Sequence, residues 1–178
     1  MIQNAIEVGK MLFRSRLVDG ASGNLSFREG DKILITKSGT NLDHLNENSF
    51  VEISHPQASR DKLVHFKIYE KTNYNAVVHC HGVFNVVLSL MRDKIIPVDL
   101  EGGMFLGELN VVSEEFGSEK YAESVAKEVK ARGVAIAKAH GIYSAGKDLI
   151  EAFNKACYVE HSCEVLYYLC LLNSFNKL

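Results

Sequence analysis

The chain has 178 residues, of which 47% are hydrophobic and 24% are charged, and its formal net charge is −2. This composition is typical of a globular protein and excludes a mainly disordered chain. Because the net charge is so small, we expect no nucleic-acid partner. We also expect no membrane partner, because the longest apolar run, residues 165–172, is too short to span a bilayer. The length predicts one domain over residues 1–178. The cysteines form no CxxC pair, which favours reduced thiols and a cytoplasmic protein.

Hydrophobic spacing and turn residues predict helices and strands that alternate along the chain. Helices are expected over residues 2–18, 61–73, 82–92, 118–132 and 148–172, with Asp148 as the N-cap of the last. Strands are expected over residues 24–28, 32–37, 76–81, 110–112 and 134–139, the first two as a hairpin. This order favours an α/β domain in which helices pack around a mixed sheet.

Two histidines flank a cysteine at the end of the predicted strand 76–81. Side chains alternate between the faces of a strand, so His79 and His81 point to one face and Cys80 to the other. Two imidazoles on one face at the end of a buried strand are half of a metal site. The alternative is a pair of hydrogen-bonded histidines that simply closes the strand.

A third histidine, His140, ends the predicted strand 134–139 and precedes a glycine. If this strand end lies on the same rim as His79 and His81, three neutral imidazoles and an open position form the pattern of a catalytic zinc site. A structural zinc site would need a fourth ligand, which Cys80 cannot supply because it faces away. For His140 alone, the alternative is a polar residue that closes a strand.

An acidic residue, Asp61, begins the predicted helix 61–73. A carboxylate at this position commonly interacts with the helix dipole, which is the structural alternative. The functional interpretation is a carboxylate that ligates a metal or transfers protons beside it. We expect His65, one helical turn later, to pack against a strand.

Two turns rich in small residues, 20–24 and 36–40, border the predicted hairpin strands. Backbone N–H groups in such turns can bind an anion, although ordinary turns have the same composition. Ser59 and Arg60 add a hydroxyl and a guanidinium, and a guanidinium is well suited to phosphate. The two turns indicate an anion site only in combination with the side chains of Ser59 and Arg60.

Five segments occur in the order, and near the spacing, of the class II aldolase/adducin family, which the chain resembles from about residue 5 to residue 170. They are GNLSFR, ILITKSGTNLDHL, ASRDKLVHFKIY, AVVHCHG and KAHGIYSAGKDLIEAF. The segment DLEGGMFLGELNVV, with Gly117 and Ser118, is similar to the middle region of the family. Within the family the chain most resembles the L-fuculose-1-phosphate aldolase branch.

The resemblance implies a three-layer αβα sandwich with a central, largely antiparallel sheet. It also implies a homotetramer with active sites at the subunit interfaces. One Zn²⁺ per chain would be held by His79, His81 and His140, and Asp61 would be the fourth ligand or the acid/base group. The family's phosphate-binding positions fall on Asn24, Ser38, Gly39 and Ser59. Arg60 stands where the family usually has a second serine, and it would be an additional phosphate ligand.

The activity that the resemblance implies is cleavage of a ketose 1-phosphate to dihydroxyacetone phosphate and an aldehyde such as lactaldehyde, with the metal as Lewis acid. One alternative is an L-ribulose-5-phosphate 4-epimerase or another metal-enediolate enzyme, such as a decarboxylase or dehydratase. Asp61 favours the epimerase, because aldolases usually carry Glu there. The other alternative is a non-catalytic adducin-like module, which the metal histidines disfavour. No residue clearly replaces a tyrosine that these aldolases carry in a longer C-terminal tail, although Tyr143 and Tyr167 are present.

Overall fold

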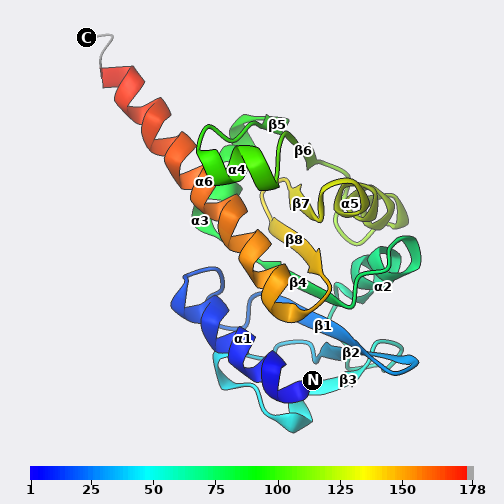
Figure 1. Ribbon diagram of the computed structural model, residues 1–178. Helices are drawn as coiled ribbons and strands as arrows, with labels where there is room; N and C mark the ends of the chain where they lie inside the picture. The colour runs from blue at the N-terminus through cyan, green and yellow to red at the C-terminus, as the bar shows by residue number, and fades with distance from the viewer. Residues whose placement is uncertain (176–178) are drawn as a thin grey trace.

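An eight-stranded sheet forms the centre of residues 1–175, the part of the chain that the computed structural model describes (Figure 1). The strand order is β3-β2-β1-β4-β8-β7-β6-β5. Within these residues, all neighbouring strands pair antiparallel except β6 and β7, which confirms a largely antiparallel sheet. The strands are β1 (Asn24–Glu29), β2 (Lys32–Thr36), β3 (Phe50–Glu52), β4 (Ala76–Cys80), β5 (Lys94–Ile95), β6 (Leu109–Val112), β7 (Val134–Ala137) and β8 (Gly141–Gly146).

Helices cover both faces of this sheet, which confirms the three-layer αβα sandwich (Figure 1). The helices are α1 (Ile2–Arg14), α2 (Lys62–Lys71), α3 (Val83–Met91), α4 (Leu100–Phe105), α5 (Glu119–Arg132) and α6 (Leu149–Phe175), with short 3-10 turns at Leu42–His44 and Glu47–Ser49. α1, α3, α4 and α6 lie on one face of the sheet. α2 and α5 pack against each other on the opposite face.

Each face of the sheet has its own hydrophobic core. Val78 and Cys80 of β4 belong to the core under α1 and α6, whereas Val77 belongs to the core under α2 and α5. Burying each valine stabilises the fold by about 1.5–3 kcal/mol. Because side chains alternate along a strand, His79 points to the same side as Val77. β4 therefore carries His79 into the layer between the sheet and the pair α2 and α5.

The first helix ends at Arg14, whereas the sequence predicted that it would end at residue 18. Arg16 adopts a left-handed backbone with φ 57°, and the N–H of Leu17 donates to the carbonyl oxygen of Leu12 at 3.0 Å. This is the Schellman ending of a helix, which brings the residue after the turn back against the last helical turn. Leu17 stays buried for this reason, and it follows Phe13 by four residues, a spacing that also fits a continuing helix.

The sequence prediction missed β8, and it placed His140 at a strand end. β7 stops at Ala137, and His140 lies in the turn to β8, after Ala139 with its φ of 57°. β8 consists mainly of small residues and begins and ends with glycine, so its local strand propensity is low. It is nevertheless fully buried and paired with β4 and β7, and this tertiary pairing decides its conformation.

The remaining differences are smaller. β4 ends at Cys80, so His81 follows the strand instead of belonging to it. The short elements β3, β5 and α4 were not predicted, and the other predicted elements are present with shifted ends. The expected cap of α6 is confirmed, because Asp148 Oδ1 accepts the N–H of Glu151 at 2.8 Å. None of the described helices combines the length and the hydropathy of a membrane span.

Candidate active site

The candidate site starts from a row of side chains across three neighbouring strands. In the sheet register His79 of β4 lies opposite Asn24 of β1 on one side and opposite Tyr143 of β8 on the other. All three side chains are buried. Gly23, just before β1, has φ +75°, and a Cβ there would lie 2.8 Å from the carbonyl oxygen of His79. Glycine therefore allows β1 to begin this close to β4.

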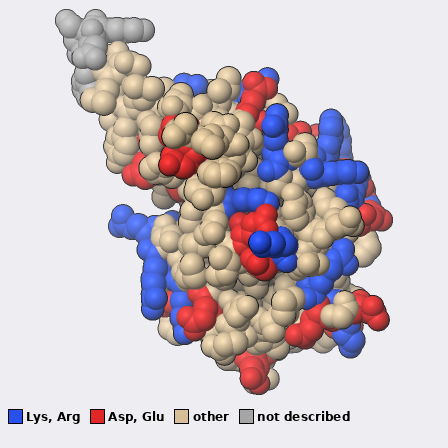
Figure 2. Space-filling model, in the orientation of Figure 1, with Lys and Arg blue, Asp and Glu red and all other residues tan. Residues whose placement is uncertain are grey.

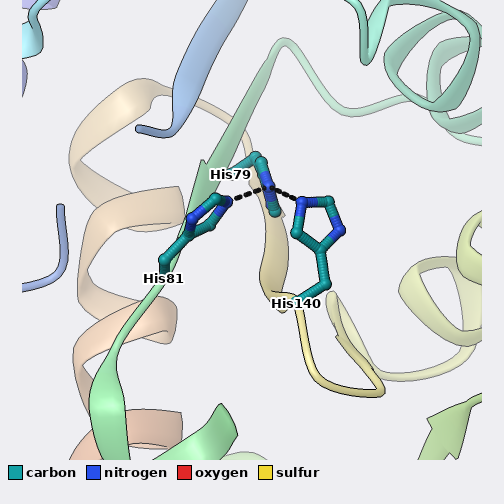
Figure 3. Close-up of side chains that lie close together, drawn as sticks. All are labelled: His79, His81 and His140. Atoms are coloured by element: carbon teal, nitrogen blue, oxygen red, sulfur yellow. Dashed lines mark hydrogen bonds between the residues drawn. The ribbon is translucent and has the colours of Figure 1, made fainter. Parts of the chain in front are cut away.

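The rings of His79, His81 and His140 are turned toward one another (Figure 3). The Nε2 atom of His79 lies 2.7 Å from Nε2 of His81 and 3.3 Å from Nε2 of His140. Backbone hydrogen bonds hold the two segments that follow the strands: the N–H of His81 donates to the carbonyl oxygen of Leu17 at 2.7 Å, and the N–H of Ala139 donates to a serine hydroxyl of α3 at 2.9 Å. The structure thus brings together the three histidines that the sequence singled out.

The histidine cluster has the donor chemistry that a metal requires. Nδ1 of His79 lies 2.9 Å from the carbonyl oxygen of Ile142, which can only accept, so Nδ1 carries the proton and Nε2 presents a lone pair to the cluster. Burial lowers the pKa of His79 well below its ordinary value and also lowers the pKa of His81 and of His140, so all three rings are neutral at neutral pH. Neutral imidazoles with converging nitrogens are ligands that divalent zinc prefers. The residues present therefore fit a metal ion.

Asp61 lies beside the cluster and is held by two hydrogen bonds. Its Oδ2 accepts from Asn24 Nδ2 at 2.7 Å and lies 3.6 Å from His79 Nε2, and its Oδ1 accepts from the Tyr143 hydroxyl at 2.9 Å. Asp61 precedes α2, but its carboxylate makes no capping hydrogen bond, so the helix-cap alternative does not explain its position. Burial raises the pKa of Asp61, while the neighbouring imidazoles and the two hydrogen bonds lower it by more, so the group is ionised at neutral pH.

A cleft of about 340 Å³ opens onto these residues. Its lining includes almost every predicted site residue: Asn24, Ser38, Gly39, Ser59, Arg60, Asp61, His81 and His140. His79 lies beneath the lining and is fully buried. A larger hollow of about 480 Å³ lies at the ends of α2 and α5 and contains none of the predicted site residues, so volume alone does not identify the site.

The polar end of the cleft is made of the turn after β2 and the segment before α2. The backbone N–H of Ser38 donates to the carbonyl oxygen of Gln57 at 2.9 Å, and the N–H of Ser59 donates to that of Thr36 at 3.1 Å. These bonds fix the two segments against each other. They also use the Ser38 N–H, so Ser38 can offer a ligand its hydroxyl but not the backbone donor that the sequence suggested. Arg60 is exposed at the edge of the cleft.

Sequence reasoning did not assign three aromatic residues at the site. Phe116 lines the cleft with its ring edge-on to His140, the ring centroids 4.9 Å apart. Tyr143 stacks on His79 with the ring centroids 4.0 Å apart, and Tyr121 of α5 places its hydroxyl 3.1 Å from Nδ1 of His140. Recognising β8 as a strand would have revealed Tyr143. No sequence signal marks Tyr121, which belongs to an ordinary amphipathic helix.

Two residues considered from the sequence lie outside the cluster. His65 packs against β1, as expected, with Nδ1 2.7 Å from the hydroxyl of Ser26. Tyr167 of α6 packs against Phe84 of α3, in the core on the opposite face of the sheet. Tyr167 is therefore no part of this cleft.

The αβα fold and the histidine cluster beside a polar cleft together fit the class II aldolases. The sequence profile described as Class II Aldolase and Adducin N-terminal domain matches residues 3–167. The chain therefore belongs to this family, as its motifs predicted.

Individual relatives share nearly the whole length of the chain. The L-fuculose phosphate aldolase of Methanocaldococcus jannaschii is 35% identical, with 97% of this chain and 96% of that protein covered. The 5-methylthioribulose-1-phosphate/5-deoxyribulose-1-phosphate aldolase of Rhodospirillum rubrum is 28% identical, with 93% and 79% covered. The crystal structure of L-fuculose-1-phosphate aldolase from Thermus thermophilus superposes with a TM-score of 0.91 at 30% identity, over 97% of this chain and 95% of that one. The family and these relatives support an aldolase, an enzyme of the lyase class.

Proposed function

We propose that the protein is a zinc-dependent aldolase that cleaves a ketose 1-phosphate, similar to L-fuculose 1-phosphate, into dihydroxyacetone phosphate and an aldehyde. The observation that carries this proposal is the convergence of three imidazole nitrogens beside an ionised carboxylate in one polar cleft. The names of the relatives, which are those of sugar-phosphate aldolases, support the same substrate class.

One Zn²⁺ per chain would be held by His79, His81 and His140, with Asp61 as a candidate fourth ligand. When bound, the ion supplies a Lewis acid that polarises a substrate oxygen. The protein contributes rigidity, because His79 is fully buried and its ring is fixed by the bond from Nδ1 to the backbone of β8. Contacts of this kind would orient His79 as a ligand and fix its tautomer.

The phosphate group of the substrate is assigned to Asn24, Ser38, Gly39 and Ser59, with Arg60 as an additional ligand. Asn24 uses one amide N–H to hold Asp61, so the second N–H remains for the substrate. The hydroxyls of Ser38 and Ser59 and the exposed guanidinium of Arg60 supply further donors. Phosphate held at this end fixes the position of the reacting carbons at the other end.

Asp61 is proposed to exchange the proton at the carbon that the breaking bond leaves on the dihydroxyacetone phosphate half: in the condensation direction its carboxylate removes this proton, and in cleavage Asp61, once protonated, returns it. Its lowered pKa means that it begins as a base, and the hydrogen bonds from Asn24 and Tyr143 fix the direction in which it points. A well-placed base of this kind contributes about 10²–10⁴-fold to the rate.

We further propose a homotetramer with active sites at its subunit interfaces and a cytoplasmic location. Large apolar side chains are exposed on α3, α4 and the C-terminal half of α6, among them Met91, Leu100, Met104 and Leu172. Figure 2 shows that uncharged residues cover most of the projecting part of α6. Surfaces of this kind are commonly buried against a partner, which supports self-association. Light scattering in solution tests the assembly, and the free thiols are consistent with a reducing compartment.

Metal analysis followed by a screen of sugar phosphates tests the proposed function. We expect about one zinc per chain, and release of dihydroxyacetone phosphate from L-fuculose 1-phosphate or a related ketose 1-phosphate. Conversion of L-ribulose 5-phosphate without such release would favour an epimerase, the second candidate, which Asp61 supports. A protein with neither zinc nor turnover would favour a non-catalytic module.

A further inference from the structure

A chain of two tyrosine hydroxyls connects Asp61 to His140 inside the molecule. The Tyr143 hydroxyl lies 2.9 Å from Asp61 Oδ1, the Tyr121 hydroxyl lies 3.2 Å from that of Tyr143, and Nδ1 of His140 lies 3.1 Å from the Tyr121 hydroxyl. Tyr143 and Tyr121 are almost completely buried, at 0% and 2% exposure. Their protons therefore have few partners other than the groups in this chain.

The direction of each hydrogen bond follows from its acceptor. The Tyr143 hydroxyl donates its single proton to Asp61 Oδ1, because the carboxylate oxygen is the acceptor of this pair. The Tyr143 oxygen then accepts the proton of Tyr121, and the Tyr121 oxygen is left to accept from Nδ1–H of His140.

This direction determines the tautomer of His140. With its proton on Nδ1, the ring turns its Nε2 lone pair toward the centre of the cluster, where Nε2 of His79 lies 3.3 Å away and also carries a lone pair. The opposite tautomer would place a proton on the nitrogen that a metal must bind. The carboxylate of Asp61 thus selects the ligand form of His140 through two intervening hydroxyls.

We propose that Tyr121 and Tyr143 are positioning residues that act as one directional chain, holding Asp61 in place and keeping His140 in the tautomer that binds metal. The inference rests on the proposed metal site and adds to it two residues that neither line the cleft nor belong to the histidine cluster, but contact residues that do. Partners of this kind typically change metal affinity by about 10–100-fold when they are removed.

Zinc affinity of single and double variants tests the chain. The full-length protein, stripped of metal with a chelator, is titrated with Zn²⁺ in competition with a chromogenic chelator. Tyr143→Phe keeps the ring that stacks on His79 but leaves the Tyr121 proton without its acceptor. We expect zinc affinity to fall about 10–100-fold, and Tyr121→Phe to weaken it as well. Tyr69→Phe is the matched control, because it removes a buried hydroxyl 2.9 Å from that of Ser26, outside the chain.

The double variant distinguishes one chain from two separate contacts. If both tyrosines act through the same chain, Tyr121→Phe combined with Tyr143→Phe weakens zinc binding no more than Tyr143→Phe alone. Two results would overturn the inference without contradicting the metal site. One is a double variant whose loss of zinc affinity equals the product of the two single losses, and the other is a zinc affinity within twofold of the wild type in both single variants. A wild-type protein that binds no zinc would instead remove the proposed site, and this inference with it. Circular dichroism on each variant shows that the fold is retained.

Discussion

Replacing Glu160 should destabilise the protein more than its position on a half-exposed helix suggests. The Glu160 side chain, from α6, reaches the first turn of α3 and accepts three hydrogen bonds: from the N–H of Phe84 at 2.8 Å, the N–H of Asn85 at 3.0 Å, and Nδ2 of Asn85 at 2.7 Å. Gly82, at the N-cap of α3, has no side chain to do this. A Cβ at Gly82 would lie 2.3 Å from the Glu160 carboxyl carbon, so glycine and glutamate fit together here.

The magnitude follows from the donors that would lose their partner. Asn85 is fully buried, so neither its side-chain amide nor its backbone N–H can turn to water after Glu160→Ala, and the amide keeps only its second bond, to the carbonyl oxygen of Gly82 at 2.7 Å. An unsatisfied buried donor costs about 1–3 kcal/mol, and loss of an N-cap costs about 0.5–2 kcal/mol. We expect a loss of about 3 kcal/mol in the free energy of unfolding, which corresponds to a fall in Tm of about 6–12 °C for a chain of this size. Glu160→Gln, which keeps one acceptor oxygen, should lose about half as much.

Urea unfolding followed by circular dichroism measures this loss, at one protein concentration for all variants because association changes apparent stability. Glu164→Ala is the control: Glu164 lies one turn further along α6 and lines a surface hollow, so its removal should cost less than about 0.5 kcal/mol. A loss for Glu160→Ala that is no larger than that of the control would refute the capping argument.

Three further predictions concern the site. His79→Ala should abolish zinc binding while far-UV circular dichroism stays unchanged, because the other four residues of β4 are also buried and keep the strand in place; metal content equal to wild type would remove the ligand assignment. At a zinc concentration that saturates the site, Asp61→Asn should retain most of the zinc and lower kcat by about two orders of magnitude or more, as typical for loss of a general base, and near wild-type turnover would leave Asp61 a structural role. Ser59→Ala should raise KM for a phosphorylated substrate with little change in kcat, and equal turnover of the unphosphorylated sugar by the wild type would contradict the phosphate site.

Local sequence patterns were sufficient for the parts of the fold that local forces decide. The hairpin of β1 and β2 and the buried strand β4 were predicted because apolar and β-branched residues stand between clear turn signals. β8 was missed because its conformation comes from pairing with β4 and β7 rather than from its small residues. The end of α1 was missed because the Schellman turn returns Leu17 to the core at a spacing that also fits a helix.

The candidate site divides in the same way. His79 and His81 could be placed together from the sequence, because the alternation of a strand is local information. His140 and Asp61 were candidates from their positions at a predicted strand end and helix start, and the family motifs pointed to the same two residues. The contacts of Tyr121 and Tyr143 could not be predicted, since they depend on how α5 lies over β8. The hydrogen bond from the Ser38 N–H to the carbonyl oxygen of Gln57 could not be predicted either, because it joins two loops and neither loop has a sequence pattern that indicates it.

The row of Asn24, His79 and Tyr143 across β1, β4 and β8 has a consequence for refolding experiments. If β4 slipped by one residue against its neighbours, His79 would turn to the α6 side and Cys80 would take its place in the row. Such a chain would keep its helices and most of its sheet, so its circular dichroism spectrum would hardly differ from that of the native protein. The ratio of bound zinc to protein after refolding would then report the fraction of molecules in which β1, β4 and β8 pair in the native register.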